Sequence, residues 1–258
     1  MAPLQDDSME QRVSLITPAY KAANVIEQTI RSVQAQSYQN WEMLIAEDCG
    51  PDNTREIVSD LSRSDSRIRL IEASHNGGPA AARNLALGQA SGRWIAFLDS
   101  DDLWLPEKLE RQIAFQLETK AALTFTGYRR ISADAARTGA YVTVPDAIDY
   151  RGLLKNTAIL TSSVMVDSRQ TGPIHMQRCY YDDFVCWLNI LREGGAARGL
   201  DEDLVRYRVL DASVSRDKGN SARQVWKTYR EIEGFGTVAS AWFFAHYAAR
   251  AALKYRRF

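Results

Sequence analysis

The sequence predicts an α/β protein whose central sheet is mostly parallel and covered by helices on both faces. In the first hundred residues, four short apolar runs alternate with segments of helical periodicity. The apolar runs are nearly continuous, as in strands that are buried on both sides. Regular alternation of strand and helix is typical of a parallel sheet. A chain of 258 residues is long enough for one large domain of this kind.

The first half of the chain is expected to hold four strands and three helices. The strands are residues 13–17, 41–46, 67–73 and 93–99, and the helices are residues 24–36, 53–63 and 79–90. Pro18 is expected to close the first strand. Asn24 is the expected N-cap of the first helix, and Asp52 or Asn53 is expected to begin the second. The third helix has Pro79 in its first turn, where a missing N–H costs nothing.

The second half is expected to continue with strands and helices and to end in a helical tail. The strands are residues 122–131, 140–145, 162–168 and 202–210, and the helices are residues 106–118, 150–156 and 180–195. The last of these helices ends in a glycine pair, which is typical of a C-cap. We therefore expect one main domain over residues 1–220 and a helical C-terminal extension over residues 221–258.

The composition argues against several classes of protein. The formal net charge is zero and the pI is about 6.8, so a nucleic-acid partner is not expected. Three cysteines are too few and too scattered for a disulfide framework or a zinc site. The first 12 residues are polar, and no apolar run approaches the roughly 20 residues that cross a bilayer. A cytoplasmic location is therefore expected, with peripheral contact to the inner face of the membrane left open.

Residues 97–104, FLDSDDLW, place three carboxylates directly after a buried strand. Asp99, Asp101 and Asp102 would repel one another unless a positive charge joined them. Capping of the next helix would need only one aspartate. Carboxylates are the ligands of hard cations such as Mg²⁺ or Mn²⁺, and Mg²⁺ usually completes its shell with substrate phosphates. The cluster therefore predicts a divalent cation and a phosphorylated substrate.

Two other segments place polar side chains near the same predicted edge of the sheet. In residues 46–54, AEDCGPDNT, Glu47 and Asp48 would face the crevice if the first two strands are neighbours, and would suit a nucleotide base or ribose. An ordinary turn explains this segment equally well. In residues 75–84, HNGGPAAARN, Arg83 suits a diphosphate, although a surface salt bridge is the alternative. The glycines do not match the dinucleotide fingerprint.

Three segments together resemble the inverting family 2 glycosyltransferases, which have a GT-A fold. These are residues 13–54, 76–87 and 92–113, and the similarity is strong over about 12–118 and looser to about 230. The chain resembles in particular the short bacterial enzymes of cell-surface polysaccharide assembly, such as the teichuronic-acid glycosyltransferases. The resemblance implies a nucleotide-sugar half over about 12–103 and an acceptor half over about 104–220. The chain lacks the Gln-x-x-Arg-Trp motif of the processive synthases, so transfer of one sugar per encounter is expected.

The resemblance also implies a role for each matching position. The positions that match nucleotide-binding residues are Thr17, Pro18, Tyr20, Glu47, Asp48, Arg83 and Asp99. Asp99 and Asp101 match the DxD motif, with Asp101 as the main metal ligand, while Asp102 supports the metal shell or the acceptor side. The implied donor is a UDP-sugar, and the implied cation is Mn²⁺ or Mg²⁺. The sequence DCGPD replaces the usual Gly-Ser of the loop at residues 48–52, which leaves the loop contacts open.

An inverting transfer also needs a group that takes the proton of the acceptor hydroxyl. Residues 180–187, YYDDFVCW, supply paired carboxylates at a helix start, where they would alternatively serve as N-terminal charges. Similar enzymes carry an acidic pair, or Gln-Asp, just before a tryptophan-containing helix, and the second acid is the base. We therefore predict Asp183 as the base, with Asp182 coupled to it through charge.

Two rival functions fit part of the pattern. A sugar nucleotidyltransferase would carry a glycine-rich loop with Arg or Lys after the first strand, where this chain has TPAYKAANV. A non-catalytic sugar-nucleotide binder or assembly partner would not need the complete set of acids. Both observations argue against the rivals, which stay as alternatives to a hexosyltransferase that acts on a glycan or lipid-linked acceptor.

The tail over residues 240–258 offers two interpretations. His246, Arg250, Lys254 and Arg257 lie on one helical stripe, and three aromatic residues precede them. An interfacial helix that contacts anionic lipid headgroups near a lipid-linked acceptor would have this pattern. A helix packed on the domain with a solvated basic face would have it equally.

Overall fold

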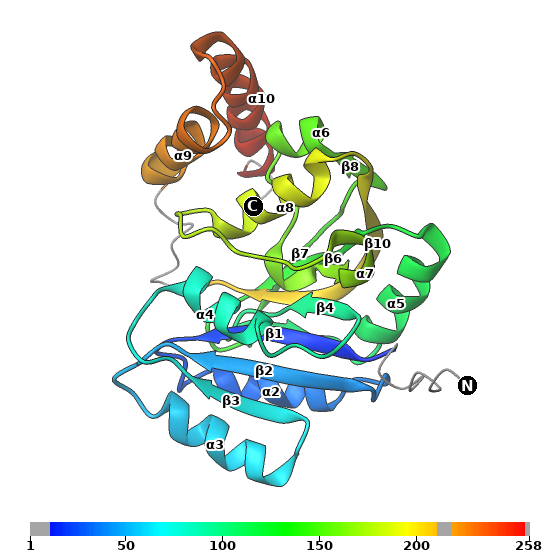
Figure 1. The fold of residues 1–258 in the computed structure, drawn as a ribbon, viewed down its shortest axis with the longest axis vertical. Coiled ribbons are helices and arrows are strands. Elements are labelled where there is room, and N and C mark those ends of the chain that lie inside the picture. Colours follow the sequence, from blue (N-terminus) through cyan, green and yellow to red (C-terminus); the bar gives the residue numbers. More distant parts are fainter. Residues whose placement is uncertain (1–10, 211–217, 256–258) are drawn as a thin grey trace, which may run out of the picture.

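The computed structural model describes residues 11–210 and 218–255, and its ten strands form one mixed sheet (Figure 1). The strand order is β3-β2-β1-β4-β9-β6-β10-β5, with β7 beside β6 and β8 beside β10. The strands are β1 (Val13–Ala19), β2 (Trp41–Glu47), β3 (Ile68–Glu72), β4 (Trp94–Phe97), β5 (Leu103–Trp104), β6 (Leu123–Ile131), β7 (Thr138–Val142), β8 (Ala147–Asp149), β9 (Met165–Asp167) and β10 (Ala196–Arg208).

The helices cover both faces of the sheet. They are α2 (Ile26–Gln34), α3 (Thr54–Ser64), α4 (Pro79–Leu87), α5 (Lys108–Thr119), α6 (Tyr150–Leu154), α7 (Ser168–Thr171), α8 (Asp182–Arg192), α9 (Lys218–Lys227) and α10 (Thr237–Tyr255), with a 3₁₀ turn at Thr161–Ser163 and a π-helical turn at Thr228–Ile232. The strands β3, β2, β1 and β4 are parallel, β9 runs against β4 and β6, and β10 is parallel to β6. The prediction of a mostly parallel sheet flanked by helices is confirmed.

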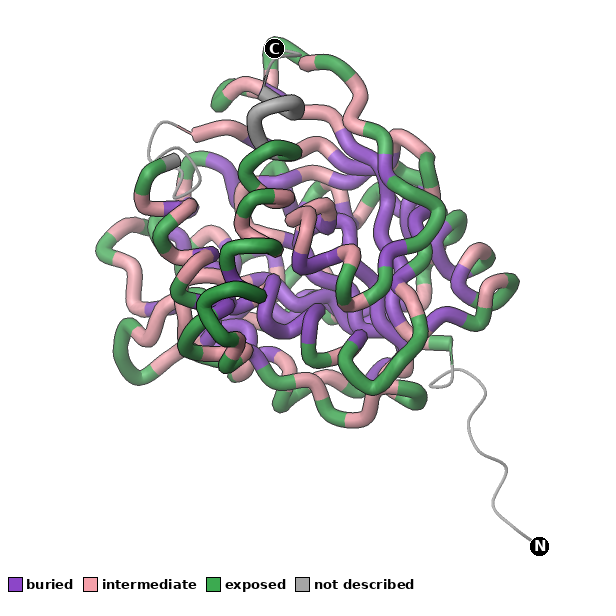
Figure 2. The backbone as a smooth tube through the Cα atoms, turned by 90° about the horizontal axis from the view of Figure 1, so that it is seen from above, coloured by how far each residue is buried: buried purple, intermediate pink, exposed green. Residues whose placement is uncertain are grey.

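Two hydrophobic layers follow from the alternation of side chains along each strand. In β1, Leu15 packs in one layer with residues of α2, α3 and α5, whereas Ile16 packs in the other with residues of α4, α6 and α8. The central strands β1, β2 and β4 are buried on both faces, and Figure 2 shows the buried segments in the middle of the molecule with exposed ones around them. This explains why β1 and β2 are continuous apolar runs in the sequence.

The carboxyl ends of β1, β2 and β4 meet at one edge of the sheet. Asp48 N donates to Ala19 O at 2.9 Å, and Leu98 N donates to Ile16 O at 3.1 Å, so the segments after β2 and β4 both leave beside β1. The strand order changes direction at β1, because β2 pairs with one side of it and β4 with the other. Ligands of open α/β sheets bind at such a point. The topology therefore brings the acidic segments after β2 and β4 to the same edge of the sheet, as expected from the sequence.

Pro18 lies within β1, and the prediction that it closes the strand is wrong. It is paired with Ala46 of β2, and β1 continues to Ala19. The pairing of β1 with β4 ends at Ile16, so the missing N–H of Pro18 points to the side where no strand follows.

Two other local predictions also differ from the structure. The N-cap of α2 is Val25 instead of Asn24, because the preceding turn is held by contacts from the start of α3: Thr54 Oγ1 accepts from Ala22 N at 2.9 Å. The expected strand over residues 162–168 is shorter, since residues 161–163 form a 3₁₀ turn before β9. The short elements β5, β8 and α7 were not expected.

The helical extension shares the core of the main body. Val225 and Tyr229 belong to the same hydrophobic layer as Leu154, and the Tyr229 hydroxyl donates to Leu154 O at 2.5 Å. Phe243 packs 6.1 Å from the Tyr229 ring, while Val238 is 86% exposed. One face of α10 is therefore packed and another faces solvent. In the described part of the chain, no helix is both long and apolar enough to cross a bilayer.

Gly199 in β10 gives a test of the packing between β10 and the segment before β8. A Cβ at this position would lie 2.1 Å from Pro145 O, a backbone atom, so Gly199→Ala forces the chain apart. We expect a loss of about 1–3 kcal/mol in the free energy of unfolding, measured by chemical denaturation. Gly236→Ala is the matched control, because a Cβ there meets open space. Equal stability of the two variants would contradict the packing described.

Candidate active site

Asp48, directly after β2, holds the loop that begins α4. Its Oδ1 accepts a hydrogen bond from Gly77 N at 2.8 Å, and its Oδ2 accepts one from Gly78 N at 2.8 Å. Its carbonyl accepts from Asn76 Nδ2 at 3.1 Å. Gly78 has a φ of 81°, a conformation that favours glycine. The Asp48 carboxylate thus fixes the point at which α4 starts, and its predicted contact with a nucleotide base stays a prediction.

Arg83, in α4, bridges two carboxylates from distant parts of the chain. Its Nη1 donates to Asp182 Oδ2 at 2.6 Å, and its Nη2 donates to Asp99 Oδ1 at 2.7 Å. Asp99 follows β4, and Asp182 begins α8, so one guanidinium joins three elements. Only 6% of Arg83 is exposed. The structure therefore brings together three predicted site residues, with Arg83 directed at carboxylates; its predicted contact with a diphosphate stays a prediction.

Charge and burial oppose each other around this guanidinium. Burial alone would lower the pKa of Arg83, but Asp99, Asp182 and Asp183 raise it above its ordinary value. Burial raises the pKa of Asp182, Arg83 acts in the opposite direction, and Asp183 raises it further. The carboxylates therefore hold the guanidinium in its charged form, and the guanidinium offsets part of the effect of burial on Asp182. Removal of either partner would leave a buried charge without compensation.

The turn after β4 gathers the three aspartates against Arg208 at the end of β10. Arg208 N donates to Asp102 Oδ1 at 2.8 Å, and Arg208 Nε donates to Asp101 O at 2.7 Å. Asp102 N donates to Asp99 O at 3.2 Å, which closes the turn. Arg208 is only 1% exposed. It therefore fixes the backbone from which Asp101 and Asp99 project.

Burial and mutual repulsion raise the pKa of two of these carboxyls. Burial, and then the nearby Asp99, raise the pKa of Asp101 to about 6. The pKa of Asp102 is raised well above its ordinary value by burial, then by Asp101 and Asp99. Asp102 Oδ2 is buried and has no hydrogen-bond partner among the described residues. The turn thus carries more negative charge than its protein neighbours compensate, which fits the binding of a cation.

The donor atoms at this turn fit Mg²⁺ or Mn²⁺, because they are all oxygens. Among the residues that the structure describes, no three His, Cys, Asp or Glu side chains form a group that could hold a metal ion. Mg²⁺ is commonly bound by one or two carboxylates and completed by substrate phosphates. Asp99 and Asp101 therefore match a cation site that the substrate completes.

Asp183 lies next to Asp182 but has different partners. Phe184 N donates to its Oδ1 at 2.7 Å, and Thr161 Oγ1 donates to its Oδ2 at 2.5 Å. Asp183 is partly exposed, whereas Asp182 is 5% exposed and bonded to Arg83. Asp183 is therefore the more accessible member of the pair, and its role as the base stays a prediction.

Four other predicted nucleotide-binding residues lie at the ends of β1 and β2 without a common contact. Thr17 is fully buried, and its Oγ1 has no partner in the described part of the chain. Glu47 is 1% exposed and accepts from Gly50 N at 2.6 Å. Pro18 is partly buried, and Tyr20 is 46% exposed. Tyr20 is thus the most accessible of the four, and the donor-binding role of all of them stays a prediction.

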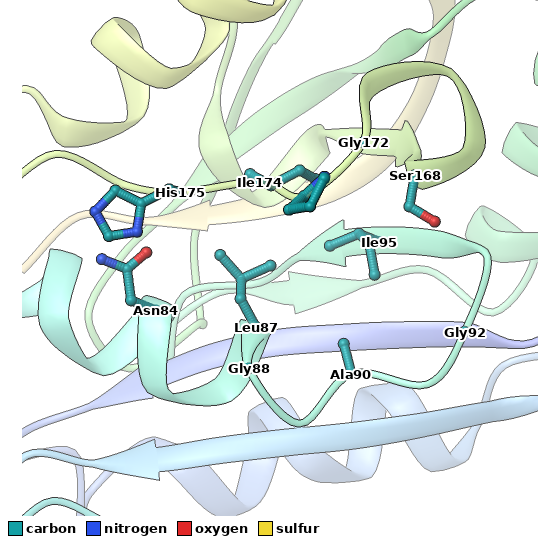
Figure 3. A pocket seen from close by; sticks show the side chains of 11 residues that line it. Asn84, Leu87, Gly88, Ala90, Gly92, Ile95, Ser168, Gly172, Ile174 and His175 are labelled. Carbon is teal, nitrogen blue, oxygen red and sulfur yellow. The ribbon is translucent and has the colours of Figure 1, made fainter.

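Two cavities lie away from the acidic turn. One of about 530 Å³ is bounded by the end of α4, Ile95 and the segment from Ser168 to His175 (Figure 3). The other, of about 740 Å³, lies beside the end of α5 and the second half of α8. Asp99, Asp101 and Asp183 line neither of them. The candidate chemistry is therefore assigned to the strand ends and not to these cavities.

Three residues that contact the acids were not found from the sequence. Thr161 bonds Asp183, Ser162 Oγ accepts from Asp99 N at 3.0 Å, and Arg208 holds the acidic turn. The run of three hydroxyl residues at 161–163 is the available signal, but residues 162 and 163 fall in the strand that the sequence predicts over 162–168. Arg208 gave no signal of its own, because arginines at strand ends are common on protein surfaces.

Comparison with known families gives one match over most of the chain. Residues 14–168 match the model of the family "Glycosyl transferase family 2". TuaG of Bacillus subtilis (strain 168), a glycosyltransferase assigned to teichuronic acid biosynthesis, is 41% identical over 243 residues, which are 94% of this chain and 96% of TuaG. The Escherichia coli UDP-Glc:α-D-GlcNAc-diphosphoundecaprenol β-1,3-glucosyltransferase WfgD is 38% identical over 215 residues, 83% of each chain.

Solved structures show the same fold at low sequence identity. S. aureus TarS 1–349 in complex with UDP superposes with a TM-score of 0.69 and 18% identity, over 93% of this chain and 71% of TarS 1–349. The mannosyltransferase PcManGT from Pyrobaculum calidifontis, in complex with GDP-Man and Mn²⁺, superposes with a TM-score of 0.69 and 16% identity, over 96% of this chain and 76% of that one. Both are glycosyltransferase folds, and the predicted GT-A architecture is confirmed.

Replacement of Arg83 tests the electrostatic link between α4, the acidic turn and α8. Arg83→Met leaves Asp99 and Asp182 without their common partner, and we expect the free energy of unfolding at pH 7.5 to fall by about 3–5 kcal/mol. Arg63→Met is the control: Arg63 and its partner Asp60, 2.6 Å away, are both exposed, so a loss below about 1 kcal/mol is expected.

The loss of stability in Arg83→Met should depend on pH. Burial already raises the pKa of Asp182 in the folded protein, and loss of Arg83 raises it further. A carboxyl whose pKa is raised by folding stabilises the fold below its unfolded pKa, and this contribution is lost as the pH rises through the folded pKa. The free energy of unfolding that Arg83→Met loses relative to the wild type should therefore be smaller at pH 5 than at pH 7.5. An equal loss at both pH values would contradict the ion-pair assignment.

Proposed function

This chain belongs to glycosyl transferase family 2, and from this membership and the geometry of the acids we propose that it is a metal-dependent, inverting hexosyltransferase. It moves one sugar from a UDP-sugar to a glycan or lipid-linked acceptor in bacterial cell-surface polysaccharide biosynthesis. The proposal for the pathway is supported by the TuaG relative, and that for the donor and acceptor by WfgD, whose name gives UDP-Glc and a diphosphoundecaprenol.

The proposed cation site is formed by Asp99 and Asp101. When bound, a divalent cation supplies positive charge to the diphosphate oxygens, on which negative charge develops as the sugar leaves. Arg83 keeps Asp99 in place through its bond to Oδ1, and Arg208 keeps the backbone of Asp101 in place. Support comes from the raised pKa of Asp101 and from the Mn²⁺ complex of PcManGT, which has the same fold.

Asp183 takes the proton in the proposed transfer. The acceptor O–H bond breaks towards the Asp183 carboxylate while the acceptor oxygen forms a bond with the anomeric carbon. The bond from this carbon to the diphosphate oxygen breaks on the opposite face, so one displacement inverts the configuration. Asp182 does not share this role, because its Oδ2 is bonded to the buried Arg83. It holds the start of α8 against the donor side.

One observation carries the proposal: Arg83 bonds a carboxylate of the DxD motif and a carboxylate of the acidic pair at the same time. The residues expected to hold the leaving group and the residue expected to activate the acceptor are thereby fixed at one edge of the sheet. A displacement between two substrates needs one group at the leaving group and another at the acceptor, both held in fixed positions.

Two substitutions test the division of roles. We expect Asp101→Ala and Asp183→Asn each to lower UDP release by at least about 10²-fold, with the fold retained, because each removes a group used in the transition state. UDP release is measured over a panel of UDP-sugars with Mn²⁺ present. Asp60→Asn on the exposed side of α3 is the control and should act like the wild type.

An active Asp183→Asn enzyme would remove the assignment of the base. Turnover that is unchanged by chelation of metal would remove the cation. Pyrophosphate release from UTP and a sugar 1-phosphate would instead identify a sugar nucleotidyltransferase. Absence of turnover over broad donor and acceptor panels would favour the non-catalytic binder.

We propose in addition that α10 contacts a membrane surface near the lipid-linked acceptor. Val238, Trp242, Ala245 and Ala249 are exposed and recur at helical spacing, so the outward face of α10 is apolar, with Arg250 exposed beside it. Phe243 and Phe244, by contrast, pack inwards. An apolar face with an aromatic residue and adjacent positive charge matches anionic lipid. The side chains of Lys254 and Arg257, which were expected on the basic stripe, lie outside the described residues.

Vesicle sedimentation tests this contact. We expect the protein to sediment with phosphatidylglycerol vesicles more than with phosphatidylcholine vesicles, and Val238→Ser with Trp242→Ser to weaken binding by roughly tenfold or more. Leu117→Ser removes an apolar side chain that is 53% exposed on α5 and should leave binding intact. Absence of vesicle binding, or equal binding by the double variant, would contradict the proposal. A dimer that the double variant dissociates would assign this face to a second copy.

A further inference from the structure

The 3₁₀ turn Thr161–Ser163 lies beneath the site and is almost completely buried. Thr161 is 4% exposed, and Ser162 and Ser163 are 0% exposed. The turn precedes β9, which pairs with β4, and Phe97 N donates to Val164 O at 3.2 Å. This pairing places the turn directly beside the end of β4, where the acidic segment begins.

Neighbouring side chains hold the turn rigidly. Trp104 Nε1 donates to Ser162 O at 2.7 Å, and Gln112 Nε2 donates to Ser163 O at 3.0 Å. The Ser163 hydroxyl donates to Leu160 O at 2.7 Å within the turn. Buried polar groups whose partners are fixed in this way lose little freedom when a substrate binds. The turn is therefore a fixed platform for its two other hydroxyls.

These two hydroxyls bond the two functional halves of the site. Thr161 Oγ1 donates to Asp183 Oδ2 at 2.5 Å, and Ser162 Oγ accepts from Asp99 N at 3.0 Å. Adjacent residues thus hold the acid of the acceptor side and the first acid of the donor side. Arg83 makes the second connection, since it bonds Asp99 and Asp182. Asp99, Arg83, the acidic pair and the turn form a closed ring.

We propose that Thr161 is a positioning residue for the base Asp183, an inference that rests on the proposed function. A carboxylate that is held only at one oxygen rotates about its side-chain bonds. Phe184 N holds Oδ1, and the Thr161 hydroxyl holds Oδ2, so the carboxylate plane is fixed with lone pairs left for the acceptor hydroxyl. Because the hydroxyl is on the platform that also bonds Asp99, it sets the base at a constant place relative to the donor.

The role predicts an effect on turnover and not on donor binding. Displacement of a reacting group by about 1 Å can cost roughly 10²-fold in rate. Thr161→Val keeps the shape of the side chain but removes the hydroxyl that donates the hydrogen bond to Asp183. We therefore expect kcat to fall roughly 10- to 100-fold, while KM for the UDP-sugar changes less than about twofold. Thr161→Ser keeps the hydroxyl and should restore most of kcat.

The experiment compares Thr161→Val, Thr161→Ala and Thr161→Ser with Thr119→Val and Asp183→Asn. Thr119→Val is the matched control, because it makes the same replacement at a partly buried hydroxyl that bonds Phe115 O at the end of α5, away from the acids. Transfer is measured with UDP-glucose and, where a second donor is faster, with that UDP-sugar. Rates are expressed per UDP-binding site from a titration, so that a partly unfolded variant does not imitate a slow one.

Low kcat in Thr161→Val and Thr161→Ala, with rescue by Thr161→Ser and normal turnover in Thr119→Val, supports the proposal. A kcat of Thr161→Val within twofold of the wild type overturns it, and so does an equal loss in Thr161→Ser, which would assign the effect to shape. In both cases Asp183→Asn remains inactive, so the proposed function stands. If Asp183→Asn is active, or the wild type turns over no donor, the proposed function fails and this inference fails with it.

Discussion

The two bonds of the Arg83 guanidinium are the interaction on which the rest of the site depends. They join Asp99 and Asp182, which are far apart in the chain, across a region where the guanidinium is almost fully buried. A buried charge is tolerated only when partners compensate it, so the electrostatics select the one placement of α8 that puts Asp182 within reach. Asp48 fixes the start of α4 through Gly77 and Gly78 and thereby places Arg83.

A second connection makes the arrangement closed. The Thr161–Ser163 turn bonds Asp183 on one side and the backbone of Asp99 on the other, without using Arg83. The ionic link is strong but depends on charge, whereas the hydroxyl link depends on backbone geometry. In the proposed function, the acids after β4 bind a cation and Asp183 takes a proton, and the two links hold these groups separately.

The sequence was sufficient for the parts of the fold that depend on local pattern. The continuous apolar runs of β1 and β2 and the helical spacing of α2 and α8 are local, and each was found near its true bounds. Pro18 and Asn24 were misjudged because their roles depend on where β4 ends and on a contact from α3. Both depend on contacts with segments that are distant in the sequence.

The sequence predicts Asp99 and Asp101 from a strand end and Asp182 and Asp183 from a helix start, but it does not predict the bonds that join these segments. Nothing in the segment around Arg83 indicates that it bonds a residue at the start of α8. Two residues of the turn at 161–163 fall in the predicted strand over 162–168, because they precede an apolar run. The bonds of the turn to Asp183 and Asp99 are not visible in that local pattern. Hydrogen bonds between segments that are distant in sequence produce no periodic pattern of residues in either segment.

The central claim is that the leaving group and the proton acceptor are held on opposite sides of one reacting carbon. The stereochemistry of the product tests it most directly. The anomeric proton coupling of the sugar in freshly formed product, observed by NMR with an α-linked UDP-sugar as donor, distinguishes inversion from retention. We expect a β-linked product, as a single displacement with Asp183 as the base requires. An α-linked product would contradict the claim, because it requires a different path from the one that these acids provide.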